Sequence, residues 1–270
     1  MKKCTIFYVS DGTAITAETV GNSLVSQFDD VEFTKIRIPF VDTVEKAQAA
    51  AQKIKDAYVD CQPLVINTVV DIELRRIIHS GGGLKLDPFN RLLRTIEDTL
   101  GIKRSPVVGK AHGVVDSESY NRRIDATNFA LVHDDGISTS YDEADIILLG
   151  VSRSGKTPTC LYLALQYGVK AANYPLTEED LDKMKIPDSV LKHRDKVYGL
   201  TIDPYRLSQI RSERRAGTRY SNLRQCQREV SDAEALFLRN GVDFLSTTDT
   251  SIEEISGKVL LALNIHNRLH

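Results

Sequence analysis

Short apolar runs alternate along the chain with longer stretches whose apolar residues recur every third or fourth position. Apolar runs of about four to eight residues are typical of buried strands, and the wider spacing is typical of amphipathic helices. Near the N-terminus this pattern predicts strands at 4–9, 33–38 and 64–67 and helices at 14–28, 43–58 and 70–79. Because strands that alternate with helices indicate βαβ units and a parallel sheet, this region is predicted to be a Rossmann-like α/β domain.

The stretch 101–119 has little periodicity and carries Pro106, Gly109 and Gly113. We therefore predict a domain boundary there, which divides the chain into an N-terminal domain, residues 1–105, and a second domain, residues 106–270. Beyond the boundary the pattern predicts strands at 145–149, 171–174, 197–202 and 244–246 and helices at 119–132, 157–167, 204–214, 223–240 and 252–263. The second domain is expected to be α/β as well.

The strand predicted at 145–149 runs directly into a segment that matches the phosphate-binding pattern GxxxxGK[ST]. In such a loop the glycines let backbone N–H groups point at phosphate oxygens, and the following helix adds a partial positive charge. Lys156 is expected to reach the terminal phosphates, and the Thr157 hydroxyl is expected to ligate Mg²⁺. The apolar flanks favour the nucleotide-binding loop of a P-loop kinase-like domain over an ordinary turn. The predicted nucleotide-binding residues are Gly150, Val151, Ser152, Arg153, Ser154, Gly155, Lys156 and Thr157.

A polar segment, His133 to Gly136, lies just before the strand that leads to this loop. Transfer of a phosphoryl group to a hydroxyl needs a base or an orienting group, and a carboxylate can supply either. Asp134, Asp135 and His133 are therefore candidate catalytic residues beside Lys156. The alternative is a polar turn, since Asp-Gly is a common turn pair.

Acidic residues follow two other predicted strands. Asp203 comes after the run 197–202 and precedes Pro204, so it is a candidate metal ligand beside Thr157 and equally a candidate N-cap of the next helix. Near the N-terminus, Asp11 or Thr13 is expected to cap the helix at 14–28. Ligand binding is the alternative there, because loops at the carboxyl ends of parallel strands often bind ligands.

Between residues 203 and 228 the chain has arginine but no lysine. The planar fork of arginine can hold phosphate or carboxylate by two hydrogen bonds, so some of these side chains are expected to contact a phosphoryl group or a partner. The others are expected to lie on a solvated helix face. The arginines are Arg206, Arg211, Arg214, Arg215, Arg219, Arg224 and Arg228.

The composition argues against several classes of protein. With 35 basic and 37 acidic residues the net charge is −2, so no global charge favours nucleic acid or membrane as a partner. No apolar stretch approaches the roughly 18 residues that span a bilayer, and the chain is expected to be cytoplasmic. The four cysteines, Cys4, Cys61, Cys160 and Cys226, form no CxxC pair and are predicted to be free thiols.

Four motifs, taken in order, resemble those of one family. They are VSDGT at 9–13, HDDG at 133–136, GVSRSGKTPT at 150–159, and GLTIDPYRL at 199–207 followed by RSERR at 211–215. Together they resemble, nearly end to end, the bacterial regulatory proteins of phosphoenolpyruvate synthase and pyruvate, phosphate dikinase. Within that family, the Ser-Gly-Lys-Thr form of the loop resembles the phosphoenolpyruvate synthase branch.

This resemblance implies a bifunctional regulatory enzyme. As a serine/threonine protein kinase it would phosphorylate a threonine of phosphoenolpyruvate synthase with ADP as donor, release AMP and inactivate the synthase. As a phosphorylase it would remove that phosphate with inorganic phosphate, release pyrophosphate and restore the synthase. Residues 150–157 would then bind ADP, and Asp134 or Asp135 would be the catalytic carboxylate.

Two other functions fit the same motifs. A P-loop kinase of small molecules would use ATP and need no protein acceptor, and a nucleotide-sensing binding protein would bind ADP without transferring phosphate. Nucleic-acid binding through the arginines is the weakest alternative, because few aromatic residues accompany them. The sequence leaves open whether the chain forms a homodimer.

Overall fold

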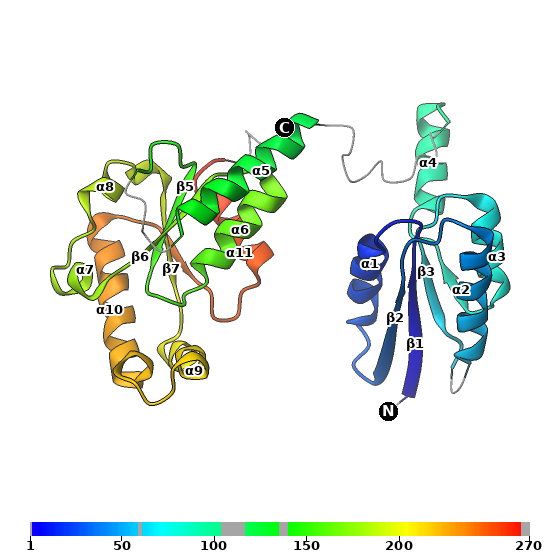
Figure 1. The fold of residues 1–270 in the computed structure, drawn as a ribbon, viewed down its shortest axis with the longest axis horizontal. Coiled ribbons are helices and arrows are strands. Elements are labelled where there is room, and N and C mark those ends of the chain that lie inside the picture. Colours follow the sequence, from blue (N-terminus) through cyan, green and yellow to red (C-terminus); the bar gives the residue numbers. More distant parts are fainter. Residues whose placement is uncertain (1, 59–60, 104–116, 135–139, 266–270) are drawn as a thin grey trace. The chain divides into compact units, whose positions relative to one another are not determined.

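The computed structural model of the chain divides into two compact units, Met1–Val114 and Val115–His270. It describes residues 2–58, 61–103, 117–134 and 140–265 (Figure 1). The boundary predicted between residues 105 and 106 falls outside the described residues. Each unit is an α/β structure on its own four-stranded parallel sheet, which confirms the predicted fold class.

The N-terminal unit has the strand order β2-β1-β3-β4. Its strands are β1 (Lys2–Val9), β2 (Val31–Ile38), β3 (Leu64–Asn67) and β4 (Leu84–Leu86). Its helices are α1 (Ile15–Val25), α2 (Val44–Asp56), α3 (Ile72–Ser80) and α4 (Asn90–Leu100). After β1, the chain adds β2 on one side of it and β3 on the other, so the strand order reverses at β1.

Alternate residues of β1 enter two separate cores. Phe7 and Val9 pack under α2 and α3, whereas Ile6 and Tyr8 pack under α1. Figure 1 shows these helices on opposite faces of the sheet. Because both faces are covered there, the buried half of β1, Ile6–Val9, is a continuous apolar run rather than an alternating one.

The predicted caps of α1 are wrong. The N-cap residue is Ala14, which has a left-handed backbone (φ 63°) and no side-chain hydrogen bond to the helix. The Asp11 carboxylate instead accepts a hydrogen bond from the Val70 amide at 2.7 Å. Asp11 therefore ties the loop after β1 to the loop after β3.

The prediction of four free thiols is also wrong, because Cys4 and Cys61 form a disulfide. β1 and β3 run parallel with Ile6 beside Leu64, so Cys4, two residues before Ile6 within β1, lies close to Cys61, three residues before Leu64. The sequence separation of 57 residues conceals this contact, and the Cα atoms lie 5.6 Å apart. Cys160 and Cys226 are free and buried.

A thiol count tests this arrangement. In the native protein we expect a thiol reagent to label neither Cys160 nor Cys226, since burial hides both thiols and raises the pKa of each. After unfolding without a reductant, the two free cysteines should react, and after reduction all four should react. Labelling of all four before reduction would contradict the disulfide.

The C-terminal unit has the strand order β6-β5-β7-β8. Its strands are β5 (Ile146–Gly150), β6 (Ala171–Pro175), β7 (Val197–Thr201) and β8 (Phe244–Ser246). Its helices are α5 (Ser117–Val132), α6 (Lys156–Tyr167), α7 (Glu178–Asp182), α8 (Asp188–Leu191), α9 (Pro204–Arg214), α10 (Leu223–Asn240) and α11 (Ile252–Ala262), with short 3-10 turns at Arg194–Lys196 and Arg219–Ser221.

Strand β5 is buried along its whole length. Ile146 and Leu148 pack with α5, α6 and α11, and Ile147 and Leu149 pack with α9 and α10 on the other face (Figure 1). β6 lies on one side of β5 and β7 on the other, so the strand order reverses at β5. Ligands of open α/β sheets bind at the carboxyl end of such a reversal, where the loop after β5 emerges.

Most predicted elements are present. The strands at 64–67 and 244–246 and the helices at 204–214 and 223–240 have the predicted bounds. Sequence reasoning missed β4, α4, α7 and α8. Among the described residues, no helix combines the length and the apolar character that crossing a membrane requires.

Candidate active site

Backbone geometry at the carboxyl end of β5 makes the loop a cradle. A Cβ at Gly150 would lie 2.3 Å from the Leu200 carbonyl oxygen, so this position has no room for a side chain. Gly155 has φ +86° and is the N-cap of α6, whose first turn has no side-chain cap. Arg153 also has a left-handed backbone (φ 76°), which is uncommon for a residue with a Cβ. The uncapped N–H groups of α6 are therefore available to an anion.

Lys156 is folded back onto the loop. Its side chain is almost fully buried, and Nζ donates a hydrogen bond to the Val151 carbonyl oxygen at 2.8 Å. A buried ammonium next to uncapped amides gives the cradle a concentrated positive charge.

Asp134 and Thr157 meet at the start of α6. The Thr157 hydroxyl donates to Asp134 Oδ1 at 2.8 Å. Asn173 of β6 donates from Nδ2 to the same oxygen at 2.5 Å and to Thr157 Oγ1 at 3.0 Å. Both hydrogen bonds to Asp134 use Oδ1, and Oδ2 has no hydrogen bond to a described residue. The loop and the predicted catalytic segment thus form one hydrogen-bonded cluster.

Sequence reasoning did not identify Asn173. This residue is buried in β6, inside a short apolar run where an amide has no packing advantage. Its Oδ1 atom is buried and has no hydrogen-bond partner among the described residues. The signal that could have identified it in the sequence is a polar residue within a strand expected to be buried, because buried polar groups require partners.

His133 contacts this cluster through its backbone carbonyl group. Its carbonyl oxygen accepts a hydrogen bond from the backbone N–H of Asn173 at 2.9 Å. Its ring stacks on Phe129 with centroids 3.8 Å apart. Its ring nitrogens lie 2.9 Å and 3.0 Å from the carbonyl oxygens of Phe129 and Ser140. Neither nitrogen is directed at a neighbouring side chain of the cluster. Asp135 lies outside the described residues.

Asp203 lies at the end of β7, away from the Asp134 cluster. Its carboxylate accepts a hydrogen bond from the Arg206 amide at 2.9 Å and so caps α9, the alternative that the sequence left open. It lines a separate hollow with Thr201 and Thr248. Among the described residues, no group of three or more His, Cys, Asp or Glu side chains could hold a metal.

A buried ion pair holds the phosphate-binding loop in position. Arg211 of α9 is about 1% exposed and pairs with Glu229 of α10 at 2.7 Å. The same guanidinium donates to the Ser152 carbonyl oxygen at 3.1 Å and stacks under the Tyr220 ring. The Tyr220 hydroxyl lies 3.0 Å from Ser152 Oγ. Arg211 therefore positions the loop and does not face the cleft.

The loop opens into a cleft of about 620 Å³ in the C-terminal unit. Asp134, Asn173 and the loop line it, together with Ile210 and Arg214 of α9. Of the arginines at 206–228, Arg214 is thus the one that lines this cleft. Arg228 and Arg219 form exposed ion pairs with Asp182 and Glu178, as expected of a solvated face.

Comparison with known proteins shows similarity along nearly the whole chain. Residues 6–260 match the model of a family described as "Kinase/pyrophosphorylase". The chain is 52% identical to proteins named "Putative phosphoenolpyruvate synthase regulatory protein" from Xanthomonas campestris pv. campestris (strain B100) and Xanthomonas oryzae pv. oryzae (strain MAFF 311018), over 98% of this chain and 97% of each relative. A protein of the same name from Stenotrophomonas maltophilia (strain K279a) is also 52% identical, over 98% of each chain. The similarity covers both units and not the loop region alone.

Proposed function

The chain belongs to the kinase/pyrophosphorylase family, and on this premise we propose that it is the bifunctional regulator of a phosphoenolpyruvate synthase. It phosphorylates a threonine of the synthase with ADP and removes that phosphate by phosphorolysis. The observation that carries the proposal is the cluster of Asp134, Thr157 and Asn173 at the mouth of the phosphate loop. It places a carboxylate beside the site where a phosphoryl group would be held.

In the kinase direction, Asp134 acts as the base. Its Oδ1 atom is held by Thr157 and Asn173, which leaves Oδ2 for the hydroxyl of the acceptor threonine. The threonine oxygen forms a bond to the β-phosphorus of ADP, the bond from that phosphorus to the bridging oxygen breaks, and AMP leaves. The threonine proton passes to Asp134. Lys156 and the first-turn amides of α6 hold the phosphate oxygens.

In the phosphorylase direction, the same carboxylate returns a proton. An oxygen of inorganic phosphate attacks the phosphorus of phosphothreonine, the bond from phosphorus to the threonine oxygen breaks, and pyrophosphate forms. Protonated Asp134 donates its proton to the departing threonine oxygen. Arg214 lines the cleft and offers a further cation to the charge on the transferring group.

The cluster also suits a magnesium ion. Thr157 Oγ1 and the Asp134 carboxylate are the oxygen donors that this hard cation prefers. When bound, Mg²⁺ would neutralise part of the charge on the phosphates. We therefore propose Thr157 with Asp134 as protein ligands, in place of Asp203, which caps α9.

Phosphate transfer to purified phosphoenolpyruvate synthase tests the proposal. β-labelled ADP and γ-labelled ATP are compared as donors, with and without the synthase. Label should reach the synthase from ADP, and added phosphate should release it as pyrophosphate. Transfer from ATP to small molecules alone would replace this function by a small-molecule kinase, and tight ADP binding without transfer would replace it by a nucleotide sensor.

Asp134→Asn should lower the rate of transfer in both directions by about 10²–10⁴-fold. The amide has nearly the shape of the carboxylate and can still accept the hydrogen bond from Thr157, but it cannot take a proton. ADP affinity, measured by calorimetry without added magnesium, should therefore change far less than the transfer rate. Asp135→Asn is the matched control, and a loss confined to that variant would move the role of the base to Asp135.

A further inference from the structure

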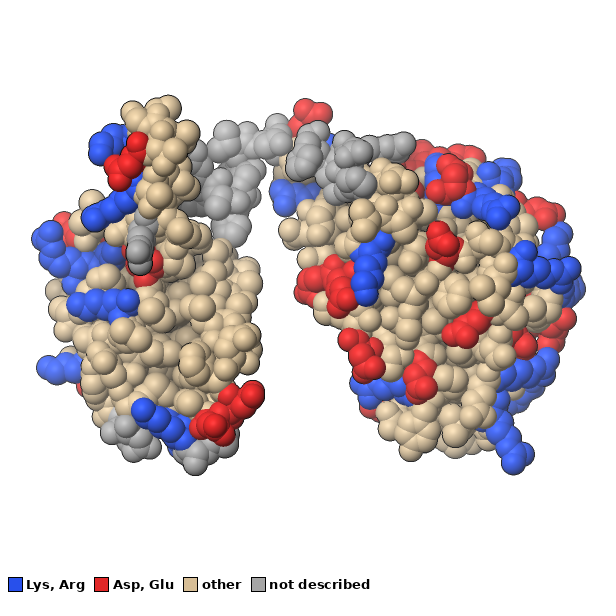
Figure 2. Space-filling model, turned by 180° about the vertical axis from the view of Figure 1, so that it is seen from behind, with Lys and Arg blue, Asp and Glu red and all other residues tan. Residues whose placement is uncertain are grey.

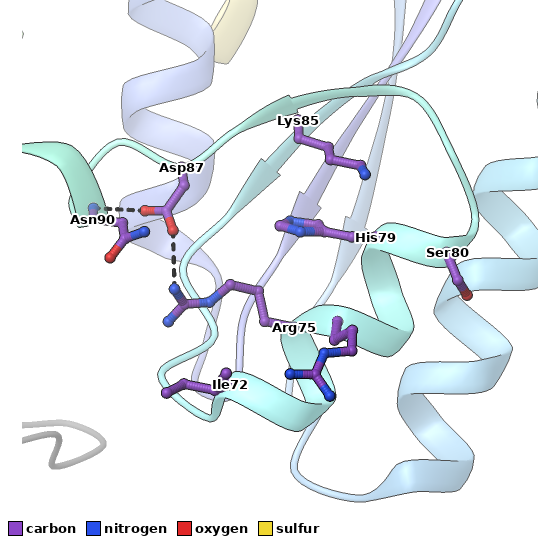
Figure 3. Close-up of a pocket in the computed structure, with 8 residues that line it drawn as sticks. Ile72, Arg75, His79, Ser80, Lys85, Asp87 and Asn90 are labelled. Carbon is purple, nitrogen blue, oxygen red and sulfur yellow. Dashed lines mark hydrogen bonds and ion pairs between the residues drawn. The ribbon is translucent and has the colours of Figure 1, made fainter.

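The N-terminal unit has a hollow of its own, about 520 Å³ in volume, between α3 and β4 (Figure 3). Arg75, Arg76 and His79 reach it from neighbouring turns of α3, and Lys85 reaches it from β4. Residues three and four apart lie on the same face of a helix, so His79 shares a face with both arginines. Asp87 is the acidic residue of the described lining.

Arg75 and Arg76 differ in the groups that they contact. Arg75 donates to the carbonyl oxygens of Val69 and Val70 and pairs with Asp87 at 3.2 Å. This network holds the guanidinium in place and neutralises the Asp87 carboxylate. Arg76 and Lys85 are exposed and form no ion pair with a described residue. The hollow therefore has two cations without a compensating charge.

His79 lies among these cations. Figure 3 shows its ring between the side chains of Lys85 and Arg75. Partial burial lowers the pKa of His79, and repulsion from Lys85 and Arg75 lowers it further, while Asp87 acts in the opposite direction. The Asn67 amide lies 3.4 Å from Nε2. In Figure 2, at the left of the view, the basic side chains of this unit gather on the side that carries α2, α3 and α4.

We propose that this hollow binds a phosphoryl dianion, either free or carried on a hydroxyl amino acid, through Arg76, Lys85 and His79. Two uncompensated cations match a dianion. None of the described lining residues is Phe, Tyr or Trp, so a nucleobase would find no large aromatic surface to stack on. The site lies in the N-terminal unit and is independent of the function proposed for the P-loop cleft.

The test uses the full-length protein and the proton NMR signal of the His79 ring. His79→Gln identifies this signal among the six histidines. Titration with inorganic phosphate should shift the signal saturably and raise the pKa of His79, because the dianion favours the imidazolium. The signal belongs to a residue of the N-terminal unit, whereas the kinase assay measures transfer at the loop of the C-terminal unit, so the two results are separate.

Arg76→Gln with Lys85→Gln should weaken phosphate binding at least about tenfold, since two charge-assisted contacts are lost. Lys53→Gln with Lys55→Gln removes two exposed cations from α2 of the same unit and should leave the affinity unchanged. Equal weakening in both double variants, or no shift of the His79 signal with phosphate or O-phospho-L-threonine, would overturn the proposal. If both probes saturate the signal, the tighter one identifies the source of the dianion.

Discussion

Replacing Lys156 with methionine is expected to lower the rate of phosphoryl transfer by about 10²–10³-fold with little change in fold stability. Nζ donates to the Val151 carbonyl oxygen of the loop itself, so in the nucleotide complex it would have to turn from that oxygen to a phosphate. Methionine fills the same buried space without the charge. The loss should therefore appear in single-turnover transfer from β-labelled ADP.

A matched control separates charge from packing. Lys192→Met removes an exposed lysine of the same unit and should leave transfer unchanged. Thermal unfolding should show a similar midpoint for both variants and the native chain. A near-native transfer rate in the Lys156 variant would contradict the role of the loop in catalysis, because no other buried cation among the described residues lines the cleft.

The periodic pattern predicted most of the fold because local signals and tertiary packing agree. Each residue of β5 is buried, so its sequence is uniformly apolar and its end at the first glycine of the loop is clear. β4 has only three residues, which is too short for a periodic pattern to distinguish it from a loop. The apolar side chains of α4, such as Leu92 and Ile96, are exposed, so packing within the N-terminal unit does not explain why these positions are apolar.

The candidate site was predicted only where its residues are contiguous. The loop at 150–157 is one segment with one pattern, and Asp134 stands in a recognisable motif. Asn173 reaches Asp134 across 39 residues of sequence, and Arg211 reaches Ser152 across 59. Such contacts depend on how strands and helices assemble, which no local pattern records. The disulfide between Cys4 and Cys61 escaped prediction for the same reason.

Arg211→Leu is expected to destabilise the C-terminal unit by about 3–5 kcal/mol. The substitution leaves the Glu229 carboxylate, about 12% exposed, without its cation, and a buried unpaired charge is costly. It also removes the donors to the carbonyl oxygens of Ser152 and Tyr220. Hydrogen exchange of the β5 amides reports the stability of this unit separately from the N-terminal one.

The double variant Arg211→Leu with Glu229→Leu distinguishes stability from positioning. Replacing both charges removes the unpaired carboxylate, so most of the lost stability should return. Phosphoryl transfer should stay low, because the Ser152 carbonyl oxygen still lacks the donor that fixes the loop. Recovery of transfer together with stability would mean that Arg211 contributes only to the stability of the fold. A stable double variant with a slow transfer step would instead show that a buried pair outside the cleft sets the geometry of the phosphate cradle.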